Sequence, residues 1–211
     1  LPFLAHVARK GKPMILSTGM STLEEVRAAF ETVVCEGNKQ VILLHCTSGY
    51  PAAPEDANLR AMKTLAETFG VPVGYSDHTL GITVPLAAVA LGACVIEKHF
   101  TVDRALPGPD HQASAEPYEL ASLVEGIRSV EKALGHGRKE PAPSEAAVAA
   151  VVRKSLVAAK DIPAGTRVTE DLLALRRPGT GLPPETFARV VGRIARRDIQ
   201  AGTLLKWEML S

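Results

Sequence analysis

Two histidines of this sequence, His78 and His99, each follow a short apolar run and lie beside an acidic residue. The runs, residues 71–75 and 93–96, have the length and composition of buried strands. Because the carboxyl ends of parallel strands meet at one edge of a sheet, we expect the two imidazoles to lie close together. Two imidazoles that leave other coordination positions open suit Mn²⁺, Fe²⁺ or Zn²⁺. The pair therefore predicts a metal site, although each ring could bond only locally and His45 could be a third ligand.

Other polar side chains follow the predicted strands. Residues 107–111 (PGPDH) form a loop stiffened by two prolines, which can present Asp110 to a substrate hydroxyl or simply make a capped turn. Hydroxyl groups beside glycines at other strand ends could bind a phosphate; they belong to Ser17, Thr18, Ser48 and Ser76. No GxxxxGK[ST], GxGxxG or GxSxG motif occurs. The residues alone indicate a metal-assisted α/β enzyme that acts on an anionic substrate.

The elements that must position these residues repeat along the first 135 residues. The apolar runs are residues 14–16, 41–44, 71–75 and 93–96, and the stretches with helical spacing between and after them are 23–34, 59–69, 84–91 and 118–134. Ser21, with Glu24 three residues later, predicts a capping box at the first long helix. The alternation predicts parallel strands joined by helices, and four such units are half of an eight-stranded barrel.

The remainder of the chain has a different pattern. Residues 136–151 are charged and contain proline, as is typical of a linker. Beyond it, the motif Asp-Ile-x-Ala-Gly-Thr begins at Asp161 and again at Asp198, 37 residues later. This repeat predicts a small, pseudo-symmetric, β-rich domain over residues 152–211.

Composition excludes several classes of protein. The chain has 211 residues, of which 46% are hydrophobic, and its richest apolar stretch, residues 84–96, is shorter than the roughly 18 residues that a membrane helix needs. We therefore expect no membrane partner. Three cysteines without CxxC spacing predict free thiols and a cytoplasmic location. Residues 153–211 carry a net charge of +5 but only two aromatic residues, so we expect no nucleic-acid partner.

The order and spacing of five motifs resemble those of the N-acylneuraminate (sialic acid) synthase family. The motifs are KPMILSTGM (12–20), HCTSGYP (45–51), GYSDHT (74–79), EKHFT (97–101) and PGPDH (107–111). The segment RRPGTG (176–181), between the two repeats, resembles that family's C-terminal antifreeze-like (SAF) domain. The resemblance covers essentially the whole chain.

This resemblance implies an α/β fold with two domains. Residues 1–135 would be the C-terminal half of a (β/α)8 TIM barrel, residues 136–151 a linker and residues 152–211 the SAF domain. Such enzymes work as domain-swapped homodimers. They condense phosphoenolpyruvate with an open-chain N-acylated hexosamine, release phosphate and form a nine-carbon 2-keto-3-deoxy acid.

The resemblance also implies roles for single residues. His78 and His99 would hold Mn²⁺ or a related ion, and Tyr50 and Asp110 would contact the sugar. Arg177 would reach the sugar's N-acyl group from the partner subunit's SAF domain. Phosphoenolpyruvate would be bound by three hydroxyl groups, those of Ser17, Ser48 and Ser76. The second of these stands where family members often carry Asn.

One departure from the family concerns the first half of its barrel. The four N-terminal β/α units, with a glutamate and the lysines that grip phosphoenolpyruvate, have no counterpart here, and the chain begins at Leu1 without Met. We expect either the C-terminal part of a longer enzyme or a half-barrel that needs a complement, and in both cases inactivity of the lone chain. A non-catalytic sugar-binding fragment and another phosphoenolpyruvate-dependent keto-acid sugar synthase are the alternatives. The sugar remains open among the sialic, legionaminic and pseudaminic pathways, as does the native metal.

Overall fold

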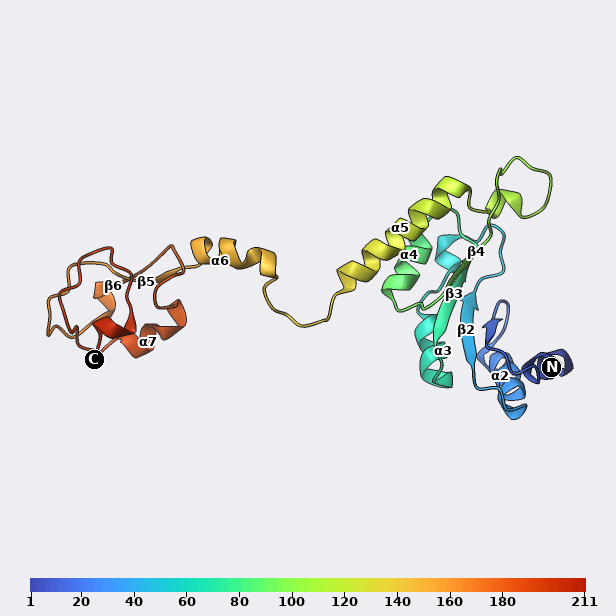
Figure 1. Ribbon diagram of the computed structural model, residues 1–211, viewed down its shortest axis with the longest axis horizontal. Helices are drawn as coiled ribbons and strands as arrows, with labels where there is room; N and C mark the ends of the chain where they lie inside the picture. Colours follow the sequence, from blue (N-terminus) through green and yellow to red (C-terminus); the bar gives the residue numbers. More distant parts are fainter. The chain divides into compact units, whose positions relative to one another are not determined.

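The computed structural model describes residues 1–211, which divide into two compact units, residues 1–137 and residues 138–211 (Figure 1). Each unit has its own hydrophobic core. No helix in the chain combines the length and hydrophobicity that crossing a membrane requires.

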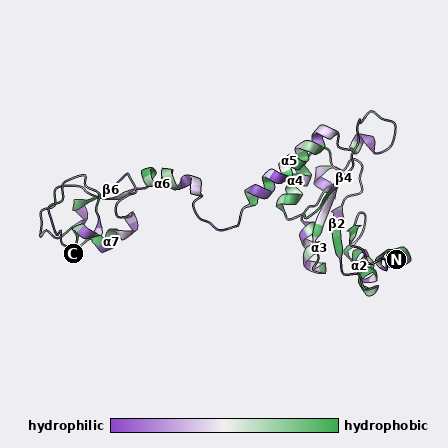
Figure 2. Cartoon of the chain, viewed as in Figure 1, coloured by the Kyte–Doolittle hydropathy of each residue, from purple (hydrophilic) through white to green (hydrophobic).

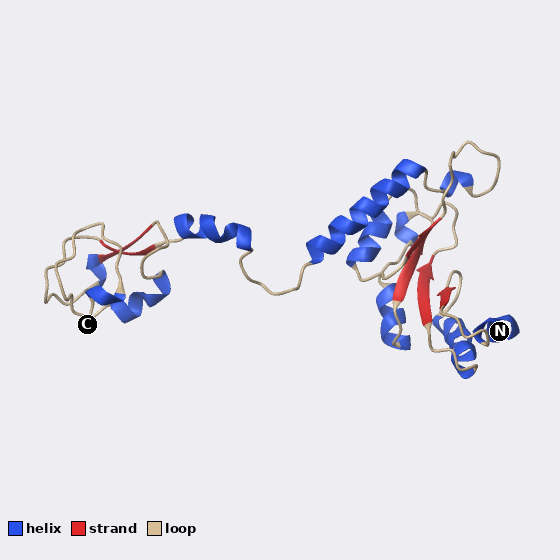
Figure 3. Cartoon of the chain, in the orientation of Figure 1, coloured by secondary structure: helices blue, strands red, loops and turns tan.

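The first unit is a parallel sheet with helices, as the alternation of the sequence predicts (Figure 3). Its strands are neighbours in chain order: β1 (Met14–Ser17), β2 (Val41–Cys46), β3 (Val73–Asp77) and β4 (Ile96–Lys98). Its helices are α1 (Pro2–Ala8), α2 (Leu23–Cys35), α3 (Ala61–Phe69), α4 (Thr83–Ala90) and α5 (Pro117–Leu134). Helix α3 packs on β2 and β3, and α5 packs on α4.

The core of this unit lies between the helices and one face of the sheet. Alternate residues of a strand point to opposite faces, so Leu43 of β2 and Tyr75 of β3 both face the helices and are fully buried. On the other face, Ile15 of β1 is 55% exposed. The apolar residues of β2 are plain in Figure 2. The buried face holds the strands against the helices and leaves the opposite face free to carry polar groups.

The last strand begins later than residues 93–96, where the sequence predicts it. Helix α4 ends at Ala90, Gly92 two residues later has a φ of +101°, and the Ala93 N–H bonds back to the Ala88 carbonyl. This six-residue bond is a Schellman closure, which glycine in the left-handed region permits. Ala93 therefore belongs to the helix end, and the strand spans Ile96–Lys98.

The capping box at the start of α2 is real but lies one residue beyond the predicted Ser21 and Glu24. Thr22 Oγ1 accepts the Glu25 N–H at 3.3 Å, and the Thr22 N–H donates to Glu25 Oε2 at 2.7 Å. Ser21 donates instead to the Gly19 carbonyl. Ser21 with Glu24 and Thr22 with Glu25 have the same three-residue spacing, so the sequence pattern alone does not distinguish them. Helix α1 has no counterpart among the predicted elements.

The second unit contains little regular structure besides a two-stranded antiparallel sheet. Strands β5 (Ser155–Ala158) and β6 (Leu173–Arg176) pair, and the helices are α6 (Ala146–Val152) and α7 (Phe187–Val190). Helix α6 occupies the end of the interval that the sequence predicts as a linker, residues 136–151, and extends one residue beyond it. The chain's single tryptophan, Trp207, is 37% exposed and carries the Arg189 guanidinium 4.9 Å from its ring centre.

Short 3₁₀ turns occur in both units. Those of the first unit are at residues 54–56 and 111–113, and those of the second are at residues 143–145, 170–172, 184–186 and 207–209.

The two copies of the repeated motif bond to each other reciprocally. The N–H of Ile162 donates to the Ile199 carbonyl at 2.8 Å, and the reverse bond measures 2.9 Å. Asp198 accepts the Ala164 N–H, and Asp161 accepts that of Ala201, both at 2.7 Å. Each copy thus completes the backbone hydrogen bonds of the other, which accounts for the pseudo-symmetry that the repeat predicts.

The position of the N-cap can be tested with two neighbouring hydroxyl groups. We expect Thr22→Ala to lower the free energy of unfolding by about 1 kcal/mol, since a cap of α2 is lost. Ser21→Ala, the matched control, should change it by less than about 0.5 kcal/mol. Urea unfolding of the whole chain, followed by circular dichroism at 222 nm, measures both. A larger loss in Ser21→Ala would contradict the assigned cap.

Candidate active site

The two predicted metal ligands lie together at the carboxyl edge of the sheet. His78 directly follows β3 and His99 directly follows β4, and these strands are hydrogen-bonded neighbours. Their ring centroids are 5.1 Å apart, with an angle of 64° between the ring planes. The Tyr50 ring lies 4.2 Å from the His78 ring and 5.5 Å from the His99 ring. Three residues that were predicted to bind metal or sugar therefore form one cluster.

The tautomer of His78 is set by a backbone carbonyl. His78 is 5% exposed, and its Nδ1 lies 2.8 Å from the Thr47 carbonyl oxygen, which can only accept a hydrogen bond. The proton therefore belongs on Nδ1, and the lone pair of Nε2 is free to bind a metal ion. This arrangement fits the predicted role of His78 as a ligand.

His45 does not join this pair. Its Nε2 bonds with the Ala57 carbonyl at 2.8 Å, and its ring lies 5.9 Å from that of Tyr75 on the helix-covered face. Within β2, Cys46 faces the other side, where its Sγ is 3.8 Å from His78 Nδ1. No group of three or more His, Cys, Asp or Glu side chains able to hold a metal ion occurs in the chain. The candidate donor set within this chain is thus the imidazole pair, without His45.

Asp110 reaches the cluster from the loop that follows β4. Its Oδ2 lies 3.9 Å from His99 Nδ1, and its side chain is 54% exposed. The short helical turn at residues 111–113 follows it directly. The loop therefore places Asp110 at the same edge as the histidines, and its contact with a substrate hydroxyl stays a prediction.

Glu97, which the sequence does not predict as a site residue, lies opposite the predicted site residue Ser76. Ser76 pairs in register with Glu97, and its Oγ donates to Glu97 Oε1 at 2.7 Å. Each of these residues lies two positions before a histidine, so all four share one face of the sheet. Sequence reasoning placed Glu97 only as a neighbour of His99. The signal that could have identified it is this two-residue spacing in both strands.

The other predicted residues have different surroundings. Ser17 ends β1 and is exposed, on the same face as Ser76. Ser48 lies beside the segment that follows β1: a Cβ on Gly19 would be 2.3 Å from Ser48 Oγ, so a larger residue at position 19 would require the Ser48 side chain to rotate away. Arg177 follows β6 in the second unit and is exposed. Its predicted contact with the sugar lies between subunits and stays a prediction.

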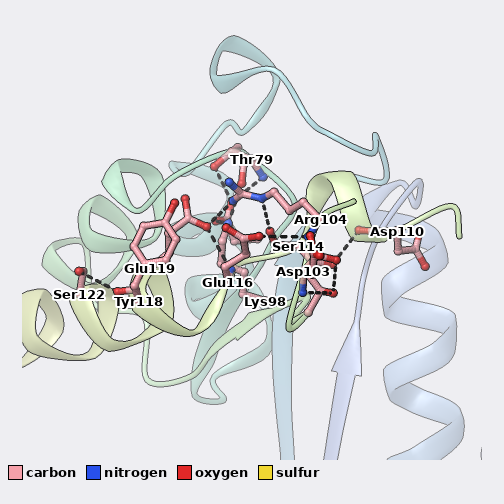
Figure 4. A network of polar contacts seen from close by, with 12 residues as sticks. Thr79, Lys98, Asp103, Arg104, Asp110, Ser114, Glu116, Tyr118, Glu119 and Ser122 are labelled. Carbon is pink, nitrogen blue, oxygen red and sulfur yellow. Dashed lines mark hydrogen bonds and ion pairs between the residues drawn. The ribbon is translucent and has the colours of Figure 1, made fainter. Parts of the chain in front are cut away.

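A buried ion pair fixes the residues next to both histidines. Lys98 Nζ lies 2.6 Å from Asp77 Oδ2, with side-chain exposures of 4% and 0%. Lys98 also donates to the Thr79 carbonyl at 2.6 Å, and Asp77 Oδ1 accepts the N–H and the hydroxyl of Thr79 (Figure 4). Two of the three N–H donors of Lys98 and both carboxylate oxygens of Asp77 are thus engaged on the helix-covered face. Lys98 is therefore not available to bind a substrate phosphate.

The hydroxyl of Tyr75 lies on the same buried face. It has no hydrogen-bond partner. Burial, and next the nearby Asp77 carboxylate, raises the pKa of Tyr75 above its ordinary value. The phenol therefore stays neutral and adds no second negative charge beside Asp77.

Comparison with known proteins assigns the chain to a family. Residues 1–139 match the model of the NeuB family, and residues 153–211 match that of the SAF domain. The chain belongs to the NeuB family. Strands β1–β4 and their helices are the C-terminal half of a (β/α)8 barrel in this NeuB chain, followed by the SAF domain, which confirms the predicted fold class.

Relatives of this NeuB chain are sugar-acid synthases. N,N'-diacetyllegionaminic acid synthase of Legionella pneumophila is 50% identical over 99% of the chain and 60% of its own length. N-acetylneuraminate-9-phosphate synthase of Homo sapiens is 43% identical over 91% of the chain and 54% of its own length. The solved N-acetylneuraminic acid (sialic acid) synthetase of Leptospira borgpetersenii matches with a TM-score of 0.64 and 47% identity, over 68% of this chain and 50% of that one. The chain thus spans 60% or less of the length of these relatives.

The buried ion pair generates a stability prediction. Lys98→Met leaves the Asp77 carboxylate buried without a partner charge, so we expect a loss of about 3–5 kcal/mol in the free energy of unfolding. The double variant Asp77→Asn/Lys98→Met buries no charge and should recover part of that loss. Lys63→Met is the control, because the Lys63–Glu67 pair is exposed and should contribute less than about 1 kcal/mol. Urea unfolding measures the free energy of unfolding of each variant. Equal losses in Lys98→Met and Lys63→Met would show that the buried pair stabilises the fold no more than the exposed one.

Proposed function

We propose that this chain is the metal-binding and sugar-binding part of a synthase. The enzyme condenses phosphoenolpyruvate with an N-acylated hexosamine to a nine-carbon 2-keto-3-deoxy acid and releases phosphate. The observation that carries the proposal is the His78–His99 pair at neighbouring strand ends, in a chain whose relatives are sugar-acid synthases. The acylated sugars of the sialic, legionaminic and pseudaminic pathways all fit this reaction.

The donor set fits a divalent transition ion, which we take to be Mn²⁺. His78 offers Nε2, since its Nδ1 donates to the Thr47 carbonyl, and His99 supplies the second imidazole. Two neutral imidazoles leave the full charge of the ion in place and leave coordination positions for oxygen ligands. When bound, such an ion supplies Lewis-acid polarisation of the sugar's aldehyde oxygen.

Side chains around the pair would bind and orient the two substrates. Tyr50 lies against both imidazoles, so its ring limits the space over the site and its exposed edge can contact the sugar. Asp110, beside His99, can accept a hydrogen bond from a sugar hydroxyl. The phosphate and carboxylate of phosphoenolpyruvate would be bound by hydroxyl groups on the same face, those of Ser17, Ser48 and Ser76.

The reaction balances without a redox partner. C3 of phosphoenolpyruvate bonds to C1 of the open-chain sugar, and the aldehyde oxygen takes up a proton. Water then adds to C2, and the resulting tetrahedral centre loses phosphate as its C–O bond breaks. Holding both substrates at one strand edge supplies proximity and orientation for the first step.

We propose further that the enzyme is a domain-swapped homodimer in the cytoplasm. In this arrangement Arg177 of one subunit would contact the sugar's N-acyl group in the site of the other. Free thiols at Cys35, Cys46 and Cys94 agree with a reducing compartment.

Histidine substitutions test the metal site. We expect His78→Ala and His99→Ala each to abolish retention of one Mn²⁺ per chain in equilibrium dialysis. In the complete natural protein, turnover should fall by about 10²-fold or more, because the polarising ion is lost. His6→Ala, on the exposed side of α1, is the control and should change neither. Full Mn²⁺ retention by both variants would contradict the assignment of the ligands. Residues 1–211 alone should bind the ion but show no turnover.

Neighbouring arginines test the contact between subunits. Arg177→Ala in the complete protein should raise the KM for the sugar by about 10-fold or more, since a hydrogen bond from a charged group is lost. Arg176→Ala, which removes the adjacent exposed arginine, should leave it within 2-fold of the wild-type value.

Mixed dimers distinguish a contact in trans from one within a subunit. Co-assembly of Arg177→Ala chains with His78→Ala chains places an intact His78 opposite an intact Arg177 in one site. We expect that site to have the wild-type KM for the sugar. A KM that stays at the Arg177→Ala value would contradict the domain-swapped arrangement.

A further inference from the structure

Arg104, in the loop between β4 and α5, bonds to three groups at the end of that loop and the start of α5. Arg104 donates its backbone N–H to Glu116 Oε1 at 3.1 Å and its Nε–H to the Ser114 carbonyl at 2.9 Å. Its Nη2 bonds to the Glu119 carboxylate on the first turn of α5 (Figure 4). One side chain thus ties the start of the loop to its end and to the helix that follows.

The bonds continue from Arg104 to Asp110. Ser114 is 3% exposed, and its Oγ donates to the Asp110 carbonyl at 2.7 Å. The N–H of Ala113 donates to the same carbonyl at 3.1 Å. A continuous path therefore runs from Glu119 through Arg104 and Ser114 to the backbone of Asp110.

The same segment is fixed to His99. The N–H of Ala115 donates to the His99 carbonyl at 2.8 Å, and the Thr101 N–H donates to the Ala115 carbonyl at 2.9 Å. Residues 114 and 115 therefore connect both to the Asp110 backbone and to the His99 backbone. Displacing this segment would change the separation of the Asp110 and His99 side chains, now 3.9 Å between Oδ2 and Nδ1.

The Arg104 guanidinium and the Glu119 carboxylate both stay charged near neutral pH. Burial alone would raise the pKa of Glu119, but hydrogen bonds from Arg104 and the Glu116 N–H hold it below its ordinary value. The Arg104 and Glu119 side chains are 31% and 17% exposed, so solvent weakens the attraction between their charges. The geometry of the guanidinium matters more: its Nε–H and Nη2–H point in fixed directions within one plane, so they hold the Ser114 carbonyl and the Glu119 carboxylate in one arrangement, which the rotating ammonium group of a lysine would not fix.

We infer that Arg104 is a positioning residue, which acts through Ser114 to hold Asp110 at the distance from His99 that sugar binding requires. This inference rests on the proposed function, in which Asp110 contacts the sugar. The effect should therefore fall on the sugar and spare phosphoenolpyruvate and the metal ion.

Variants of the complete natural protein test this inference by the effect on each substrate. In Arg104→Met, we expect the KM for the sugar to rise by about 10-fold or more, because small displacements of a contacting group are costly. The KM for phosphoenolpyruvate and the affinity for Mn²⁺ should stay within 2-fold of the wild-type values. Arg104→Lys should keep most of the thermal stability but show the same rise. Ser114→Ala breaks only the last link and should reproduce the rise if Arg104→Met does not fold.

The control is Arg128→Met, which removes another α5 ion pair, Arg128–Glu131, that is exposed and remote from the loop anchor in sequence. It should leave both KM values unchanged. A wild-type KM for the sugar in Arg104→Met, or in Ser114→Ala where Arg104→Met does not fold, would overturn the inference. Equal rises in both KM values would also overturn it, since they indicate a general structural role.

The failure of the proposed function would look different. If the wild-type protein shows no turnover with phosphoenolpyruvate and any N-acylated hexosamine, the reaction is wrong. The positioning role is then judged from hydrogen exchange measured by mass spectrometry. Faster exchange confined to residues 101–116 in Arg104→Met, absent in Arg128→Met, would support it, and unchanged exchange would overturn it.

Discussion

The register between β3 and β4 is the constraint on which the candidate site depends. Ser76 lies opposite Glu97, and Asp77 lies opposite Lys98. Because side chains alternate between faces, a slip of one residue would turn the second histidine toward the helices. The buried pair of Asp77 and Lys98 opposes such a slip, since each charge would be left buried without its partner. The ion pair on the helix-covered face thus favours one register of the two strands. That register places the two imidazoles side by side on the opposite face.

Much of this arrangement could be predicted from the sequence, and the exceptions have physical reasons. Three of the four strands begin within two residues of the predicted apolar runs, because burial on one face leaves a clear pattern. The fourth was placed too early, since Ala93 completes a helix end whose closure depends on the backbone of Gly92. The N-cap of α2 lies one residue beyond the predicted Ser21, because two overlapping pairs, beginning at Ser21 and at Thr22, both have the spacing of a capping box. His78 and His99 were identifiable because strand ends converge, whereas the networks around Lys98 and Arg104 depend on contacts between side chains distant in the sequence.

The second unit illustrates how a repeat can build a fold with little regular structure. Each copy of the motif supplies an aspartate that accepts a backbone N–H of the other, at Ala164 and at Ala201. Neither copy has these groups satisfied by itself, so the two must form together. The repeated residues made the pseudo-symmetry predictable, but not the hydrogen bonds between the two copies. The predicted contact of Arg177 rests on the family resemblance alone, because an exposed side chain near a strand end does not itself indicate what it binds.

The environment of Trp207 gives this two-unit protein a built-in optical reporter. It is the chain's only tryptophan, it belongs to the second unit, and it is partly exposed with the guanidinium groups of Arg189 and Arg193 over its ring. Indole emission excited at the red edge of its absorption therefore comes from the SAF domain alone, while the barrel half contributes only tyrosines. The melting of one unit can be followed without interference from the other, in the same cuvette and without an added dye.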